Sequence, residues 1–129
     1  MKLFYVAKDG GPDSSVTGYW LIEAKAAISA LILEFDGRSR DAFHNHAFSA
    51  LSWVLKGGLT ETMLDGEVRR HRPSLKPIWT PREVFHRVDS DEGKTWVVSF
   101  RGPWVNRWKE WWPKEQKFVN LSSGRKIEE

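Results

Sequence analysis

Short apolar stretches alternate with turn residues along most of the chain. The stretches richest in apolar and aromatic side chains are 20–35, 43–55, 59–64, 84–88 and 95–100. Between them stand sequences that favour tight turns: Asp36-Gly37, Gly57-Gly58, Asp65-Gly66 and the segment DSDEG at 89–93. Many short strands separated by such turns are typical of a β-sandwich or a β-barrel. We therefore expect an all-β protein, and no stretch predicts a βαβ unit.

Some details of this pattern predict individual elements. Residues 9–18 (DGGPDSSVTG) predict a loop, because Gly, Pro, Asp and Ser favour turns. The stretch 43–55 predicts one long strand, and Gly57-Gly58 predicts the two-residue turn of a hairpin. The Ala-rich segment 23–30 (EAKAAISA) suits a helix as well as a strand, and we expect strands over most of it.

The C-terminal segment has a different pattern. Four tryptophans stand at 104, 108, 111 and 112, after Pro103 and before Pro113. Their spacing places the four rings on one face of a helix that begins at Pro103 and ends before Pro113, and a strand stays open as the alternative. Because an amphipathic stripe usually belongs to the core, we expect these rings to pack against the barrel more often than to line a pocket.

Length and composition describe an ordinary globular protein. The 129 residues argue for a single domain, 1–129, with its core at about 20–102 and 103–129 as a C-terminal extension. Apolar residues make up 40% and charged residues 29%, and aromatic residues are frequent, with eight Trp and seven Phe. There is no Cys, which excludes disulfides and zinc sites built on thiolates.

The apolar runs and the charge limit the location and the partners. The run before Lys8 is too short for the apolar region of a signal peptide, and the run 26–33 is too short to span a bilayer, so we expect a cytoplasmic protein without a membrane partner. The net charge is only +3, which argues against nucleic-acid binding. The basic run 69–72 (RRHR) is typical of a solvated strand face, so we expect His71 to face solvent.

Three of the four histidines form a pattern that suits a metal ion. His44 and His46 are two residues apart, and side chains at this spacing on a strand point to the same face. Neutral imidazoles placed in this way can bind one ion such as iron, zinc, nickel or copper. His86 follows about forty residues later, in a predicted strand after Pro81. An isolated HxH pair often lies on the surface, so the third histidine strengthens the hypothesis.

Two segments resemble the motifs of the cupin family. Residues 37–58 (GRSRDAFHNHAFSALSWVLKGG) are similar to the first cupin motif, with its HxH pair, apolar strand and closing Gly. Residues 77–88 (PIWTPREVFHRV) resemble the second motif, with a Pro before the third His. The resemblance covers roughly 28–108 and is strongest to a group of short, stand-alone, largely uncharacterised cupins of bacteria and phages.

The resemblance implies both a fold and a ligand set. The fold is the cupin-type double-stranded β-helix, a jelly-roll barrel, with the Trp-rich segment added as a short helix or strand. In this fold, His44, His46 and His86 become the ligands of one divalent metal ion (Fe, Zn, Ni or Mn) inside the barrel. A homodimer is a further expectation from the resemblance. The reaction is not implied, because one fold hosts many activities.

One departure from the family concerns an acidic ligand. Cupins usually supply a Glu four or five residues after the second His, and here these positions are Ala50 and Leu51. If Gly57-Gly58 closes a hairpin, Glu61 faces Val54 and points inward. We expect Glu61 to be a pocket residue for substrate rather than a metal ligand, with an arginine as the partner that keeps it ionised.

The leading functional hypothesis is a metalloenzyme that acts on a small acidic molecule. Three neutral ligands leave the charge of the ion undiminished. Three protein ligands also leave coordination positions for substrate and oxygen, much as the facial triad of non-haem iron(II) dioxygenases does. Arg101 and Arg107 flank the Gly-Pro turn and are the candidate groups for a substrate carboxylate or phosphate, with a surface salt bridge as the commoner alternative for such arginines. A non-redox isomerase, epimerase or lyase is the alternative, and a non-catalytic module that binds a small ligand is the third hypothesis.

Overall fold

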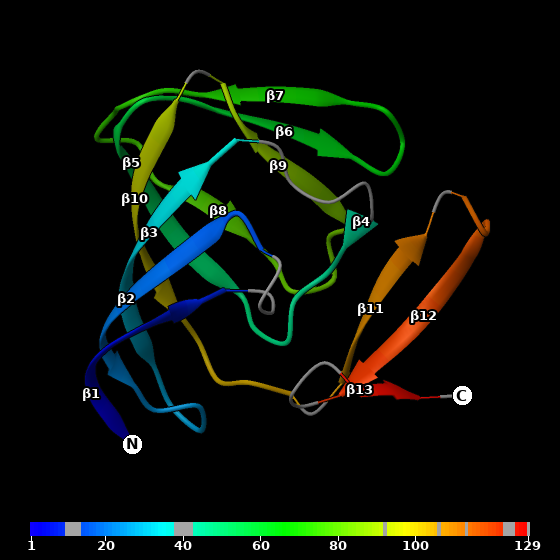
Figure 1. Ribbon diagram of the computed structural model, residues 1–129, viewed down its shortest axis with the longest axis horizontal. Coiled ribbons are helices and arrows are strands. Elements are labelled where there is room, and N and C mark those ends of the chain that lie inside the picture. Colours follow the sequence, from blue (N-terminus) through cyan, green and yellow to red (C-terminus); the bar gives the residue numbers. More distant parts are fainter. Residues whose placement is uncertain are drawn as a thin grey trace.

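The computed structural model describes residues 1–9, 14–37, 43–91, 93–105, 107–112, 114–122 and 126–128, with the backbone alone at 107, 112, 121–122 and 126–128. This part of the chain forms two antiparallel β-sheets and contains no helix (Figure 1). The all-β prediction is therefore confirmed. Within the same residues there is consequently no helix of the length and apolarity that a membrane crossing requires.

The first sheet has six strands in the order β1-β2-β3-β10-β5-β8. In chain order its strands are β1 Lys2–Lys8, β2 Val16–Glu23, β3 Ser29–Asp36, β5 Ala50–Lys56, β8 Ile78–Thr80 and β10 Lys94–Arg101. Strand β10 pairs with both β3 and β5, so it joins segments that are far apart in the sequence. Strands form over 20–23 and 29–35, but 24–28 is the turn between β2 and β3, so the expectation of strands over most of the Ala-rich segment 23–30 is wrong.

The second sheet has seven strands in the order β13-β12-β11-β4-β9-β6-β7. In chain order its strands are β4 Phe43–His44, β6 Leu59–Met63, β7 Val68–His71, β9 His86–Ser90, β11 Arg107–Trp112, β12 Lys117–Ser122 and β13 Lys126–Glu128. The two-residue strand β4 pairs with β9 on one side and with β11 on the other. It thereby connects the C-terminal hairpin to the rest of the sheet (Figure 1).

The core lies between the two sheets and follows the alternation of side chains along the strands. In β3, Leu31 and Leu33 are buried, whereas Ile32 between them is half-buried on the opposite face. These two leucines pack with buried side chains of four other strands: Trp20, Val54, Leu59 and Val97. A second buried cluster, Ala47, Phe48 and Ala50, packs against Trp104, Val105 and Trp108.

Gly57-Gly58 connects the two sheets instead of closing a hairpin. Val54 pairs with Val97 of the first sheet, whereas Glu61 pairs with Val88 and Arg69 of the second. Gly57 has a φ of 91°, and a Cβ there would lie 2.5 Å from the Thr95 Oγ1. The predicted hairpin and the predicted pairing of Glu61 with Val54 are therefore wrong, because β5 finds its partners in β8 and β10.

Two further boundaries differ from the sequence prediction. The long strand expected over 43–55 is interrupted: β4 ends at His44 and β5 begins at Ala50, so 45–49 is a loop. Of the loop expected over 9–18, residues 10–13 lie outside the described residues, and β2 already begins at Val16. Strand β1 was not expected at all, and it pairs with β2 at the edge of the first sheet.

The Trp-rich segment is a strand, so the expected helix is wrong and the strand alternative is right. In β11, alternation turns neighbouring rings to opposite faces: Trp108 contacts Trp104, with ring centroids 6.4 Å apart, whereas Trp111 contacts Phe118 at 4.8 Å. Pairing with both β4 and β12 supplies backbone hydrogen bonds that outweigh the helical spacing of the rings.

Candidate metal centre

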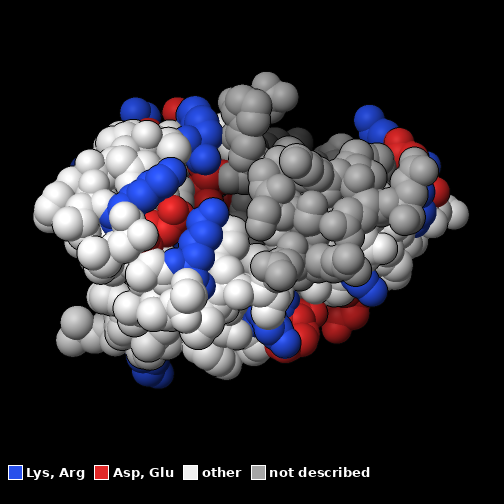
Figure 2. All heavy atoms as spheres, turned by 90° about the horizontal axis from the view of Figure 1, so that it is seen from below, with Lys and Arg blue, Asp and Glu red and all other residues white. Residues whose placement is uncertain are grey.

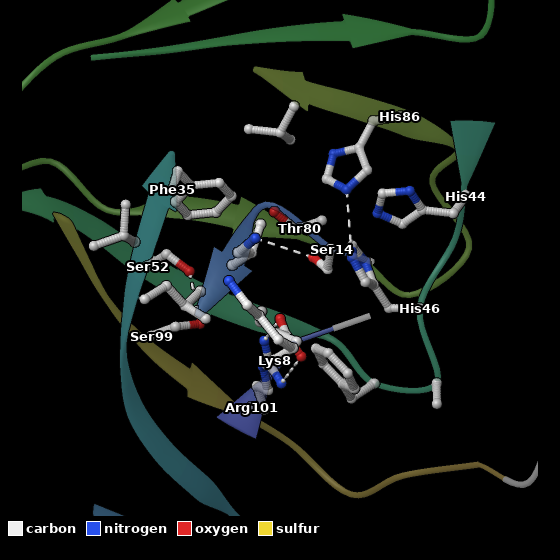
Figure 3. A pocket seen from close by; sticks show the side chains of 18 of the residues that line it. Lys8, Ser14, Phe35, His44, His46, Ser52, Thr80, His86, Ser99 and Arg101 are labelled. Atoms are coloured by element: carbon white, nitrogen blue, oxygen red, sulfur yellow. Dashed lines mark hydrogen bonds and ion pairs between the residues drawn. The ribbon is translucent and has the colours of Figure 1, made fainter. Parts of the chain in front are cut away.

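The rings of His44, His46 and His86 converge at one end of the space between the sheets. Their centroids are 4.8 to 5.0 Å apart, and one ring nitrogen of each lies within 4.8 Å of those of the other two. His86 is buried, and the other two are half-buried. The three rings point toward one another from the second sheet and the loop beside it (Figure 3). The structure thus brings together all three histidines that the sequence nominated.

His44 and His86 meet because of the strand register. They are direct partners in the antiparallel pairing of β4 with β9, and directly opposed side chains lie on the same face of a sheet. On the other side of β4, His44 lies opposite Glu110 of β11, which is 1% exposed. His44 is therefore placed by two neighbouring strands, from 86–90 and 107–112.

His46 reaches the centre from a loop that is hydrogen-bonded on both sides. Its own N–H donates to the carbonyl of Arg82 at 3.2 Å. The preceding Asn45 donates its N–H to the Lys109 carbonyl at 3.1 Å, and its Oδ1 accepts from the Lys109 N–H at 2.6 Å. These contacts hold the loop 45–49 against β11 and against the segment before β9. The loop takes the place of the continuous strand that the HxH spacing predicted.

The separation of two ring nitrogens fits a shared metal ion. The Nε2 atoms of His46 and His86 face each other at 3.4 Å. Two nitrogens that bind one ion tetrahedrally at about 2.0–2.1 Å lie about 3.3–3.4 Å apart. Burial, together with the neighbouring His44, His86 and Arg101, lowers the pKa of His46 well below its usual value. His46 is thereby neutral, which is the form that binds a metal.

A carboxylate behind His86 fixes the orientation of its ring. The Nδ1 of His86 donates to the Glu61 Oε2 at 2.5 Å, which leaves the lone pair of Nε2 directed toward the other histidines. The second oxygen of Glu61 lies 3.0 Å from the Nε2 of His71. Metal-binding histidines commonly have such a carboxylate partner on the nitrogen that does not bind the ion.

Glu61 is ionised in spite of its burial. Desolvation is the largest influence and raises the pKa of Glu61, but the hydrogen bonds from His86 and His71 outweigh it and lower the pKa to about 2. Two sequence expectations are wrong here. The partners of Glu61 are histidines rather than an arginine, and His71 does not simply face solvent, since its side chain is 20% exposed and bound to Glu61.

The three histidines line a cavity of about 500 Å³ between the sheets. Across the cavity from His44 and His86 lie Lys8 and Arg101 (Figure 3). The Arg101 guanidinium is buried, and it is paired with Asp9 through bonds of 2.7 and 3.3 Å. Arg101 thus lies inside the molecule rather than at a surface salt bridge. The side chain of Arg107 lies outside the described residues.

The rest of the cavity wall is aromatic and acidic as well as basic. Tyr5 stacks on Trp20 with ring centroids 4.8 Å apart, and burial together with a hydrogen bond to Glu23 raises the pKa of Tyr5.

On the face of the molecule shown in Figure 2, lysine and arginine side chains are spread out, with acidic atoms between them, rather than forming one basic surface.

Some wall residues were missed from the sequence. Asp9, Tyr5 and Glu110 line the cavity. Asp9 was expected in a loop, the strand that contains Tyr5 was not expected, and the segment that contains Glu110 was expected to be a helix. A strand pattern over WKEWW would have placed Glu110 on the same face as Trp108, which is the only local signal in the sequence for this carboxylate.

No protein-family model matches the chain, and no curated protein matches it. Solved structures do. A sugar phosphate isomerase of the cupin superfamily from Silicibacter pomeroyi superposes with a TM-score of 0.64 at 10% identity, over 99% of this chain and 92% of that chain. An RmlC-like cupin from Shewanella frigidimarina gives 0.59 at 18% identity, over 78% and 84%. The iron(II) form of HppE gives 0.61 at 14% identity, over 76% and 56%.

These superpositions show the fold: the chain is a small cupin in architecture, and the predicted jelly roll is confirmed. The chain spans little more than half the length of HppE, so that protein's activity as a whole cannot be transferred to it. Three histidines in close proximity can hold a metal ion in this fold.

Proposed function

We propose that this small cupin holds one divalent transition metal on His44, His46 and His86 and uses it to transform a small acidic molecule. The observation that supports the metal site best is the 3.4 Å separation of the facing Nε2 atoms of His46 and His86. The carboxylate of Glu61 on the other nitrogen of His86 supports it independently, because that contact selects the tautomer that a metal requires.

We assign a separate role in the proposed function to each group of residues that lines the cavity. Glu61 orients His86, so it is assigned to the metal end and no longer to the substrate. Phe48 and Trp104, with ring centroids 4.9 Å apart, line the cavity beside His46 and make that part of its wall apolar. Arg101 and Lys8 line the same cavity and attract an anionic substrate. The metal, when bound, supplies Lewis acidity and, if it is iron, the capacity to activate dioxygen.

The leading reaction class is an oxidation by dioxygen. Three protein ligands leave coordination positions for both a substrate and oxygen, as the facial triad of non-haem iron enzymes does. The superposition on the iron(II) form of HppE supports iron as the metal. An all-imidazole set without a carboxylate ligand suits iron, nickel, copper and zinc better than magnesium or calcium.

A non-redox isomerisation is the second candidate. It is supported by the superposition on the sugar phosphate isomerase, which covers 99% of this chain, including the C-terminal strands. In that case the metal acts as a Lewis acid alone. Oxygen uptake separates the two candidates: protein reconstituted with iron(II) consumes oxygen when its substrate is added only if the oxidation is right.

The metal content of the purified protein tests the proposal. Protein made without a histidine tag is analysed for all transition metals, and we expect about one equivalent per chain. The His86→Ala variant should contain less than about a tenth of this. His71→Ala is the matched control, because it removes a histidine that lies outside the group of three, and it should retain the metal. Equal metal content in both variants would contradict the proposal.

A further inference from the structure

Arg101 carries the strongest unexplained feature of the cavity. Its side chain is 4% exposed, and its Nη1 and Nη2 donate to the two oxygens of Asp9 at 3.3 and 2.7 Å. The Nε of Arg101 is buried and has no hydrogen-bond partner among the described residues. A guanidinium has five N–H groups, so Asp9 uses only part of the donor capacity of this buried group.

An aromatic ring links Arg101 to the candidate metal centre. The Phe48 ring centroid lies 5.2 Å from that of His46, and the Arg101 Cζ lies 4.4 Å from the same Phe48 ring. The guanidinium carbon is therefore no more than about 10 Å from the His46 ring. Both groups line the one cavity, so a single small molecule can reach both of them.

The charges of the cavity wall favour a doubly negative ligand. Among the described residues that line it, four are lysine or arginine and four are aspartate or glutamate. With neutral histidines these fixed charges cancel at neutral pH. A divalent ion on three neutral ligands then leaves about two positive charges in a poorly solvated space, and one dianion compensates them.

We infer that the cavity takes a small dianion with two acid groups, one at the metal and the other at Arg101. The inference rests on the proposed metal site and goes beyond it by naming the class of the ligand and the residue that anchors its far end. Asp9 is the counter-ion of Arg101 in the free protein, and the ligand's second acid group binds the donors that Asp9 leaves over.

The geometry indicates how long this ligand needs to be. A metal lies about 2 Å from the His46 nitrogen, and a carboxylate carbon paired with a guanidinium lies about 4 Å from Cζ. With the two ring distances, a separation of roughly 6 Å or less between the two acid groups is enough for a ligand to reach both ends, so a short diacid suffices. Isophthalate is such a diacid. A biphenyl with carboxylates at its opposite ends has the same charge and a longer separation, and benzoate has the size but half the charge.

Calorimetry on the cobalt(II)-loaded protein, together with its visible spectrum, tests the inference. We expect isophthalate to bind at least ten times more tightly than benzoate or the biphenyl dicarboxylate, and to shift the cobalt bands. Equal affinity for isophthalate and benzoate would overturn the two-point anchor. Equal affinity for isophthalate and the longer diacid would overturn this spacing of the two anchors and, with it, the role of Arg101.

Two variants with opposite expected effects on ligand affinity distinguish a ligand-binding role of Arg101 from a role in the fold alone. Arg101→Gln should weaken isophthalate about tenfold or more, whereas Asp9→Asn should strengthen it severalfold, because it frees the guanidinium and removes one negative charge. Arg70→Gln is the control, since Arg70 is an exposed arginine of β7 that does not line the cavity. If Asp9→Asn and Arg101→Gln weaken binding alike, Arg101 only supports the fold and the inference fails.

Metal stoichiometry, measured on every sample, separates this inference from the proposed function. If the wild-type protein binds cobalt at one equivalent but shows no preference for isophthalate, the inference fails and the metal site stands. If the wild-type protein does not bind cobalt, the proposed function fails and the inference falls with it.

Discussion

The histidine end and the arginine end of the cavity differ in the charge that they offer to a ligand. At the histidine end, β4 and β9 of the second sheet and the loop 45–49 present imidazole nitrogen atoms, and the carboxylate of Glu61 on β6 lies behind His86. At the arginine end, Arg101 of β10 in the first sheet meets the charge of Asp9 directly. The histidine end therefore suits a cation, whereas the arginine end has its charge compensated and keeps spare donors for an anion.

The difference also shows how each end depends on the fold. The His44–His86 contact lies within one sheet and follows from the pairing of two adjacent strands. The Arg101–Asp9 pair joins positions 92 residues apart, from the end of β10 and the residue after β1. The first arrangement survives as long as β4 and β9 stay paired, and the second needs the edge strand β1 in place.

The largest expected effect breaks the histidine end alone. His44→Ala should weaken the affinity for zinc about 1000-fold, because one of three ligands is lost. Chelator competition at constant pH measures this, with His71→Ala as the control that stays within about tenfold of the wild type. A loss of less than about tenfold for His44→Ala would show that the three rings do not share an ion.

The second largest effect is expected on stability, when the ion pair at the arginine end is removed and the histidines are left unchanged. Asp9→Ala leaves the buried guanidinium of Arg101 without its counter-ion and should lower the free energy of unfolding by about 3 kcal/mol. Glu34→Ala is the control, since its pair with the exposed Lys94 is worth less than about 1 kcal/mol. Urea denaturation measures both, and equal losses would contradict the difference between the two pairs.

The third effect tests the carboxylate behind His86. Glu61→Gln keeps the size of the side chain but cannot offer an anionic acceptor to both His86 and His71, so the affinity for metal should fall by roughly 30-fold. The exposed Glu67, which pairs with Arg69, provides the control Glu67→Gln. An unchanged affinity in Glu61→Gln would mean that the tautomer of His86 is fixed without this carboxylate.

The smallest effect is expected from a change in the loop 45–49, which presents His46. Asn45→Ala removes the acceptor of the Lys109 amide and should weaken metal binding by about threefold, because the loop that presents His46 loses one of its anchors. Asn120→Ala, on the exposed side of β12, should change nothing. A large loss of stability in Asn45→Ala instead would show that the bond serves the sheet rather than the site.

Local pattern was enough to predict the class of fold and the three histidines, but not the conformation around them. The spacing of His44 and His46 predicted one strand, yet His46 lies in a loop held by Arg82 and Lys109. Those partners are 36 or more residues away in the sequence, so no local rule contains them. The histidines still converge, because the opposing pair on β4 and β9 fixes two of the three positions.

Partners that depend on sheet order were beyond the sequence. Glu61 does point inward, but by pairing with Val88 and Arg69 rather than through the hairpin that predicted it. Its partner His71 and the Asp9 of Arg101 both stand in polar or Gly-rich segments that are typical of solvated surface. Only the order β9-β6-β7 in one sheet and the position of β1 in the other bring these groups inside.

The most direct test of the central claim is anomalous diffraction from crystals of the protein loaded with iron or zinc, recorded above and below the absorption edge of that metal. The account predicts one strong anomalous peak at about 2.0–2.2 Å from a ring nitrogen of each of His44, His46 and His86. A peak bound by only one of the three rings, or located at His71, would contradict it.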